Sequence, residues 1–225
     1  MSLSQRRDAL LSDVLQGRDL ARHWARLCVG MALGAAVYGA VLGQWHGPRL
    51  ALYVAVKLPM VLLLTSGLTL LLSWILAQLL GLPLRFGQVA VLIFLGLASA
   101  SVMLASLAPV AWLFTVSAPP PTTAARTAHN LLYLMHTGFV GSSGLAGSFA
   151  LRQALRATGR PPEVVRRVYG SWILAYAFVG GEIAWALRPF VGSVYHPVVF
   201  LRDDALRGNV YEFIFTDILP HLLSR

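Results

Sequence analysis

The sequence predicts an all-α fold: a polytopic integral membrane helical bundle of five transmembrane helices, with an N-terminal amphipathic helix and a C-terminal interfacial helix. Of the 225 residues, 57% are hydrophobic and only 12% are charged, whereas soluble domains have about 25% charged residues. The mean hydropathy is +0.68, and five apolar runs are about as long as the ~20 residues that a spanning helix needs. This composition excludes a soluble globular, disordered or disulfide-stabilised domain.

Residues 1–23 form a cytoplasmic amphipathic segment in this prediction. Between Ser4 and Arg22, apolar residues such as Leu10, Leu11 and Val14 recur at helical spacing with arginines among them. This pattern is typical of a helix that lies on a membrane surface. Three aspartates in the segment argue against a secretory signal peptide. We therefore expect the segment to be retained.

The membrane domain covers residues 24–187, and its five spans run at about 24–42, 50–80, 86–116, 128–151 and 168–187. The second run would extend about 46 Å as a single helix, which exceeds the hydrocarbon thickness of roughly 30 Å. Pro59 lies near the start of that run and removes a backbone donor. We therefore expect a kink there, or a short outer segment before the main span.

Residues 188–225 form an outer loop and a short interfacial helix in this prediction. Asn209 and Glu212 have the spacing of a capping box, and an apolar run follows them at 213–222. With Asp217 and Pro220 inside, that run is too short to be a sixth span.

The distribution of arginines predicts the orientation. The alternate loops on one side have only Arg49 and Arg126. The N-terminal segment and the remaining loops between spans have eleven, at positions 6, 7, 18, 22, 26, 85, 152, 156, 160, 166 and 167. Since cytoplasmic loops are enriched in basic residues, the N-terminus is expected in the cytoplasm and the C-terminus in the periplasm or outside. The arginines of the C-terminal tail conflict mildly with this orientation.

Small residues predict where the helices pack, because lipid provides little hydrophobic driving force between them and close approach needs small side chains. The first span offers one flat face with two G-x-x-x-G pairs, and the fourth span is rich in glycine and serine on more than one face. The packing positions are Gly30, Gly34, Gly39 and Gly43 in the first span and Gly141, Gly144 and Gly147 in the fourth.

Three polar side chains within the spans form a candidate intramembrane site. Glu182 is the only acidic residue in any span, Lys57 is expected at a similar outer depth, and His136 lies within the fourth span. An ionisable residue inside a membrane suggests a function. A Lys57–Glu182 pair follows, and it either fixes the register of two helices or belongs to an ion or proton path. His136 is expected to be a hydrogen-bonded packing residue.

The basic loop between the fourth and fifth spans is a candidate site for anionic lipid, although topology signalling alone explains its arginines. The residues concerned are Arg152, Arg156, Arg166 and Arg167. The net charge of +9 does not form the clustered patch that nucleic acid needs. The single Cys28 excludes an internal disulfide, and the spacing of Cys and His predicts no metal site and no cofactor. Gly141–Gly144 lacks the context of a nucleophile motif, so we expect no enzyme.

The end of the chain resembles an uncharacterised group of bacterial polytopic membrane proteins. Their last span enters a W-x-L-R-P-F-x-G-S-P motif, and an F-x-x-x-x-x-G-N-F-Y-like stretch follows. Val194 replaces the proline, Val210 replaces the aromatic residue, and Glu182 stands where the group has Gln. The likeness covers about the last fifth of the chain and implies a topology but no substrate. The second and third spans are also similar to Yip1-type membrane domains. The residues that match the C-terminal motif of the bacterial group are Trp185, Leu187, Arg188, Pro189, Phe190, Gly192, Ser193, Phe200, Gly208, Asn209 and Tyr211.

These observations predict a non-enzymatic protein of the bacterial inner membrane that acts as a subunit or scaffold of a membrane protein assembly. Its partners would be the lipid bilayer and other membrane chains, either copies of itself or different proteins. The alternative is an oligomeric ion or proton channel, or a small transporter, that uses Glu182, Lys57 and His136. The chain has no evident internal repeat, whereas many transporters have one.

Overall fold

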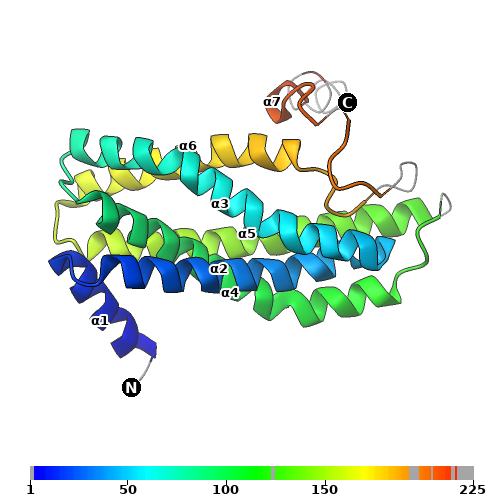
Figure 1. Cartoon of the computed structure of the whole chain (residues 1–225), viewed down its shortest axis with the longest axis horizontal. Coiled ribbons are helices and arrows are strands. Elements are labelled where there is room, and N and C mark those ends of the chain that lie inside the picture. The colour runs from blue at the N-terminus through cyan, green and yellow to red at the C-terminus, as the bar shows by residue number, and fades with distance from the viewer. Residues whose placement is uncertain (1–2, 123–124, 193–197, 204, 214–215, 217–225) are drawn as a thin grey trace.

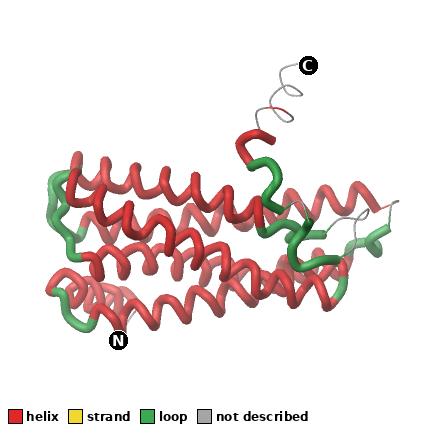
Figure 2. The backbone as a smooth tube through the Cα atoms, turned by 45° about the horizontal axis from the view of Figure 1, so that its top comes forward, coloured by secondary structure: helices red, strands yellow, loops and turns green. Residues whose placement is uncertain are grey.

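A computed structural model describes residues 3–122, 125–192, 198–203, 205–213 and 216. Within these ranges the chain has helices and no strand. The long helices lie side by side with their connections at the two ends of the bundle (Figures 1 and 2). The elements are α1 (Leu3–Gln16), α2 (Leu20–Gly43), the 3-10 helix η1 (Gln44–His46), α3 (Pro48–Leu79), α4 (Phe86–Ser117), α5 (Arg126–Arg156), α6 (Pro162–Ala186) and α7 (Val210–Phe213).

Three of the described helical segments are long and apolar enough to cross a membrane: Leu20–His46, Pro48–Leu79 and Phe86–Ser117. The apolar helices indicate a membrane location. The helices α5 and α6 have 31 and 25 residues, but glycines, serines and terminal arginines lower their apolar content. Five spans therefore stay a prediction.

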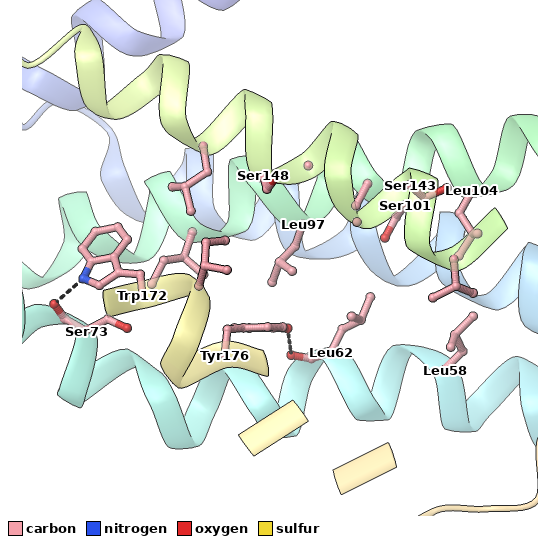
Figure 3. A pocket seen from close by; sticks show the side chains of 18 residues that line it. Leu58, Leu62, Ser73, Leu97, Ser101, Leu104, Ser143, Ser148, Trp172 and Tyr176 are labelled. Carbon is pink, nitrogen blue, oxygen red and sulfur yellow. Dashed lines mark hydrogen bonds between the residues drawn. The ribbon is translucent and has the colours of Figure 1, made fainter. Parts of the chain in front are cut away.

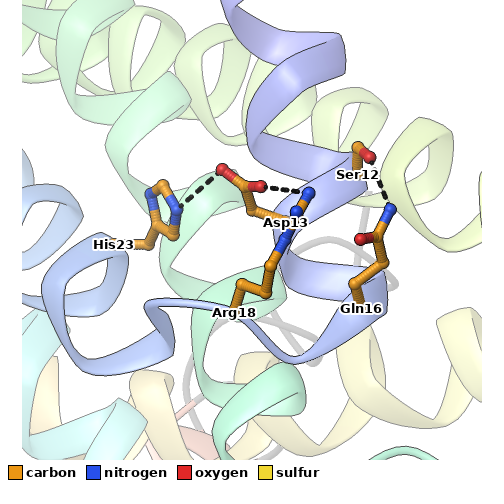
Figure 4. A network of polar contacts seen from close by, with 5 residues as sticks. All are labelled: Ser12, Asp13, Gln16, Arg18 and His23. Atoms are coloured by element: carbon orange, nitrogen blue, oxygen red, sulfur yellow. Dashed lines mark hydrogen bonds and ion pairs between the residues drawn. The ribbon is translucent and has the colours of Figure 1, made fainter.

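The N-terminal segment is not one continuous amphipathic helix. It breaks after α1 at Gly17, whose φ of +73° is a left-handed conformation that favours glycine, and α2 already begins at Leu20. Asp13 holds the turn, because its carboxylate lies 2.9 Å from Arg18 and 3.5 Å from His23 (Figure 4). The helix α2 therefore begins inside the segment predicted at 1–23.

The helix α1 packs against one end of the bundle. Val14 is fully buried there in a cluster with residues of α4, α5 and α6. Gln88, near the start of α4, donates from its side-chain amide to the Val14 carbonyl oxygen at 2.8 Å. The predicted amphipathic face of α1 thus covers other helices rather than lipid alone.

The helix α4 is central, since it contacts α2, α3 and α5 and is the most buried of the three apolar helices. Its observed bounds, Phe86–Ser117, confirm the helix predicted at 86–116. The helix α3 continues through Pro59 from Pro48 to Leu79. The separate outer segment predicted before Pro59 is therefore absent, because a proline inside a long packed helix removes one hydrogen bond without ending the helix.

Glycines of α2 face two different helices. A Cβ atom added to Gly34 would lie 2.7 Å from the Ser101 carbonyl oxygen of α4, whereas one added to Gly39 would lie 2.5 Å from the Val54 carbonyl oxygen of α3. Gly43 is equally close to α3, at Leu50. The single flat face predicted for this span is therefore wrong. Helix α2 turns different glycines toward two neighbours.

The other four predicted packing glycines do not all have a neighbour within the described chain. Gly147 packs on α4, where an added Cβ would lie 2.6 Å from the Gly96 carbonyl oxygen. By contrast, no atom lies within 4 Å of a Cβ added to Gly30, Gly141 or Gly144. These three glycines therefore do not pack on another described helix of the same chain, because spacing in the sequence does not reveal which face of a helix has a neighbour. Their assignment as packing positions stays a prediction.

Candidate functional site

Lys57, the only lysine of the chain, is fully buried. Its ammonium donates to the Pro189 carbonyl oxygen at 3.2 Å. The Nζ atom also lies 5.2 Å from the ring centroid of Phe200 and 5.9 Å from that of Phe190. Cation–π contacts and a charge-assisted hydrogen bond compensate in part for removing the charge from water. Lys57 therefore attaches the loop after α6 to α3.

The loop motif after α6 is held by several such contacts. Arg188 donates to the Trp185 carbonyl oxygen at 2.8 Å, and its guanidinium lies 3.9 Å from the centroid of the Trp185 ring. Gly192 has a φ of +82° and packs so closely on His46 that a side chain there would clash. The Gly192 carbonyl oxygen lies 3.0 Å from Nε2 of His129 on α5. Ser193, also part of the motif, lies outside the described residues.

The start of the predicted interfacial helix is confirmed. The backbone N–H of Glu212 donates to the Asn209 side-chain oxygen at 2.7 Å, as a capping residue requires. The Tyr211 hydroxyl donates to the Phe178 carbonyl oxygen of α6 at 2.8 Å, and the two rings stack. The short helix α7 therefore rests on the outer part of α6. Most of the predicted run at 213–222 lies outside the described residues.

Glu182 lies on α6, beside α7. Its Oε1 atom is buried and has no hydrogen-bond partner among the described residues. Burial, and secondarily the negative charge of Glu182, raise the pKa of the Tyr211 hydroxyl above its usual value. No ion pair joins Glu182 to Lys57 in the part of the chain that the structure describes. The predicted pair is therefore not formed, because Lys57 is occupied by Pro189, Phe190 and Phe200 of the loop.

His136 is a hydrogen-bonded packing residue, as predicted. It is 3% exposed, and its Nδ1 lies 2.7 Å from the hydroxyl oxygen of Tyr38 on α2. The two rings meet edge to face, with centroids 5.6 Å apart. Of the three polar residues that the sequence grouped into one site, Lys57 and His136 thus have different partners, and Glu182 Oε1 has no hydrogen-bond partner among the described residues. The structure does not bring the three residues together.

A cavity of about 220 Å³ lies where α3, α4, α5 and α6 meet. Its walls are almost entirely apolar, and the small residues Gly144, Gly147 and Ser148 of α5 form one side of it. On the opposite side, α6 is fastened to α3, because Trp172 donates to the Ser73 carbonyl oxygen at 2.8 Å and Tyr176 donates to that of Leu62 at 3.1 Å (Figure 3). The sequence pattern does not predict this cavity, because its lining comes from four helices.

Two serine hydroxyls in the cavity wall have no partner. Ser101 on α4 and Ser143 on α5 are 1% and 2% exposed, and neither Oγ atom has a hydrogen bond among the described residues. Both lie at the same end of the cavity, close to Leu104 (Figure 3). The cavity is therefore apolar along most of its length, with two hydroxyl groups at the end near Leu104.

A second pocket, of about 440 Å³, lies at the connection of α5 and α6. Three of the four arginines predicted as a lipid site, Arg152, Arg156 and Arg166, line it. Arg160 also lines it, whereas Arg167 does not. The one acidic residue in its wall is Glu163. The side-chain guanidinium of Arg152 lies 5.9 Å from the centroid of the Tyr169 ring of α6.

No protein-family model, curated protein or solved structure matches the chain. The resemblance of the loop motif to a group of bacterial membrane proteins therefore stays a resemblance. These comparisons therefore assign no function to the chain.

Proposed function

We propose that the chain is a non-enzymatic, multi-spanning protein of the bacterial inner membrane that acts as a subunit or scaffold of a membrane protein assembly. In this proposal α2, α3, α4, α5 and α6 all cross the bilayer, the N-terminus is cytoplasmic and the C-terminus is periplasmic or outside. The antiparallel order of the helices supports this arrangement, because it gathers the predicted cytoplasmic arginines at one end of the bundle (Figure 1).

The observation that supports an assembly role is the open glycine face of α5. Gly138, Gly141 and Gly144 are exposed, and no atom lies within 4 Å of a Cβ added to any of them. Within a bilayer, such glycines let another helix approach closely and gain packing contacts. Large apolar side chains border the face, including Leu134 and Leu145, which are 69% and 62% exposed. A transmembrane helix of a second membrane chain fits this surface.

Cysteine cross-linking in native membranes tests the proposal. Gly141→Cys would be made in a Cys28→Ser background, because Cys28 is the only cysteine. We expect Gly141→Cys to cross-link to a second membrane chain. The matched control is Leu33→Cys, which is also exposed and lies at a similar depth on α2. Equal cross-linking at both positions, or none at Gly141→Cys, would contradict a specific partner surface.

The channel or transporter alternative has less support, because Lys57 and His136 have separate partners and no contact joins either of them to Glu182 among the described residues. Reconstituted liposomes test it directly, with the chain inserted and ion flux measured. We expect no conductance above that of empty liposomes. A conductance that Glu182→Gln abolishes would favour the alternative over the scaffold.

A further inference from the structure

The strongest unassigned feature is a furrow between α5 and α6 that is cationic at one end and apolar along the rest. We propose that this furrow binds one anionic glycerophospholipid of the leaflet next to the arginine end. The arginines of the pocket hold the phosphate, and the apolar cavity holds an acyl chain. The proposal rests on the proposed membrane crossing of α5 and α6, which a topology reporter inserted in the connection between these two helices tests separately.

The arginine pocket has the chemistry of a phosphate site. Arg152, Arg156, Arg160 and Arg166 surround it, with one opposing carboxylate from Glu163. None of these arginines forms an ion pair with an acid in the described ranges. Guanidinium groups bind phosphate through paired, charge-assisted hydrogen bonds. A cluster of uncompensated arginines at a membrane boundary therefore favours an anionic headgroup.

The apolar cavity and the arginine pocket lie near each other along the same two helices. On α5, Leu151 lines the cavity and the next residue, Arg152, lines the pocket. On α6, Arg166 lines the pocket and Trp172 lines the cavity. A cationic site near an apolar site matches the headgroup and the acyl chain of a phospholipid.

The dimensions of the cavity fit an acyl chain. Along α5 it reaches from Leu151 to Val140, which corresponds to roughly 16 Å at ~1.5 Å per residue. One leaflet of hydrocarbon is about 15 Å thick, half of the ~30 Å core. The length of the cavity along α5 therefore matches that of an acyl chain in one leaflet.

A lipid can enter the furrow from the side. Val140 and Gly144 line the cavity and are also exposed on the outer surface of the bundle. Helix α6 is fastened mainly to α3, and α5 packs mainly on α4, so few contacts close the gap between α5 and α6. In a bilayer the molecules beside this gap are lipids, which makes them the available occupants.

Native mass spectrometry of the full chain, purified in detergent and titrated with phosphatidylglycerol or phosphatidylcholine, tests the proposal. We expect phosphatidylglycerol to bind at least about tenfold more tightly, because each nearby arginine contributes up to about 1 kcal/mol toward an anionic lipid and tenfold corresponds to about 1.4 kcal/mol. The double variant Arg152→Gln/Arg156→Gln should lose this preference. Arg167→Gln is the matched control, because Arg167 is exposed but does not line the pocket, and it should keep the preference.

A separate variant tests whether the cavity binds the acyl chain. Gly144→Leu fills the cavity, and because no atom lies within 4 Å of its Cβ position the variant should fold. We expect it to weaken the binding of both lipids, whereas Gly141→Leu, on the open face outside the cavity, should not. Inorganic phosphate should not displace the lipid.

Four outcomes would each overturn the proposal. The two lipids could bind with equal affinity, or Arg167→Gln could lose the lipid preference as much as the double variant does. Gly144→Leu could leave lipid binding unchanged, or inorganic phosphate could displace the lipid. None of these outcomes depends on Gly141→Cys cross-linking, so failure here is distinguishable from failure of the assembly role.

Discussion

The two halves of the bundle use glycine in opposite ways. Between α2, α3 and α4, Gly34, Gly39 and Gly43 allow backbones to meet so closely that an added Cβ would lie within 2.7 Å of a carbonyl oxygen. On α5, Gly138 and Gly141 face open space. These three glycines of α2 are packed against other helices of the chain, whereas Gly138 and Gly141 of α5 lie on an open surface. The same residue type thus allows close packing at one place and leaves room for another molecule at the other.

Substitution by leucine should give the largest difference in stability between these two kinds of glycine. Gly39→Leu would force α2 away from the Val54 backbone of α3, and we expect it to destabilise the chain by about 3 kcal/mol or to prevent folding, since overpacking a tight core is costly. Gly141→Leu should change stability by less than about 0.5 kcal/mol, as an open surface site does. Thermal unfolding in detergent, followed by circular dichroism, measures both. Equal losses in the two variants would show that α5 is as tightly packed as α2.

The sequence predicted the helices because they depend on local properties. Apolar runs gave the bounds of α4 almost to the residue, and the cap at Asn209 was visible as a motif. The partner of Lys57 was not predictable, because Pro189 lies 132 positions away and no local pattern reports such a contact. Expecting an acid as the partner was reasonable, but a backbone carbonyl and two aromatic rings took its place.

The furrow was predictable only in part, for a similar reason. The arginines of the basic loop were visible in the sequence, and three of the four proposed for lipid line one pocket. The cavity was not visible, because it depends on how far α6 stands from α5, and contacts of Trp172 and Tyr176 with α3 set that distance. Small residues on α5 predicted neighbours on several faces, and spacing alone does not distinguish a filled face from an empty one.

A polar contact, rather than glycine packing, joins the outer part of α5 to the packed half. Tyr38→Phe removes the hydroxyl that bonds His136 and leaves a buried ring nitrogen unpaired, so we expect a loss of about 1 kcal/mol or somewhat more. His136→Phe alone should cost a similar amount, and the double variant should lose less than the sum. A double-mutant cycle from chemical unfolding measures this coupling. Strict additivity would mean that the contact does not contribute to stability.

The smallest expected effect concerns α7, which rests on the outer end of α6. The pKa of the Tyr211 hydroxyl is raised by burial first and by the charge of Glu182 second. Glu182→Gln removes that negative charge, so the phenolate becomes easier to form and the pKa should fall, yet stay above its usual value because the burial remains. NMR of ¹³C-labelled tyrosine, assigned with Tyr211→Phe, follows the titration. Glu212→Gln should have a smaller effect, since its exposed carboxylate is screened by water and salt. An unchanged pKa in Glu182→Gln would place the carboxylate away from Tyr211 and detach α7 from this part of α6.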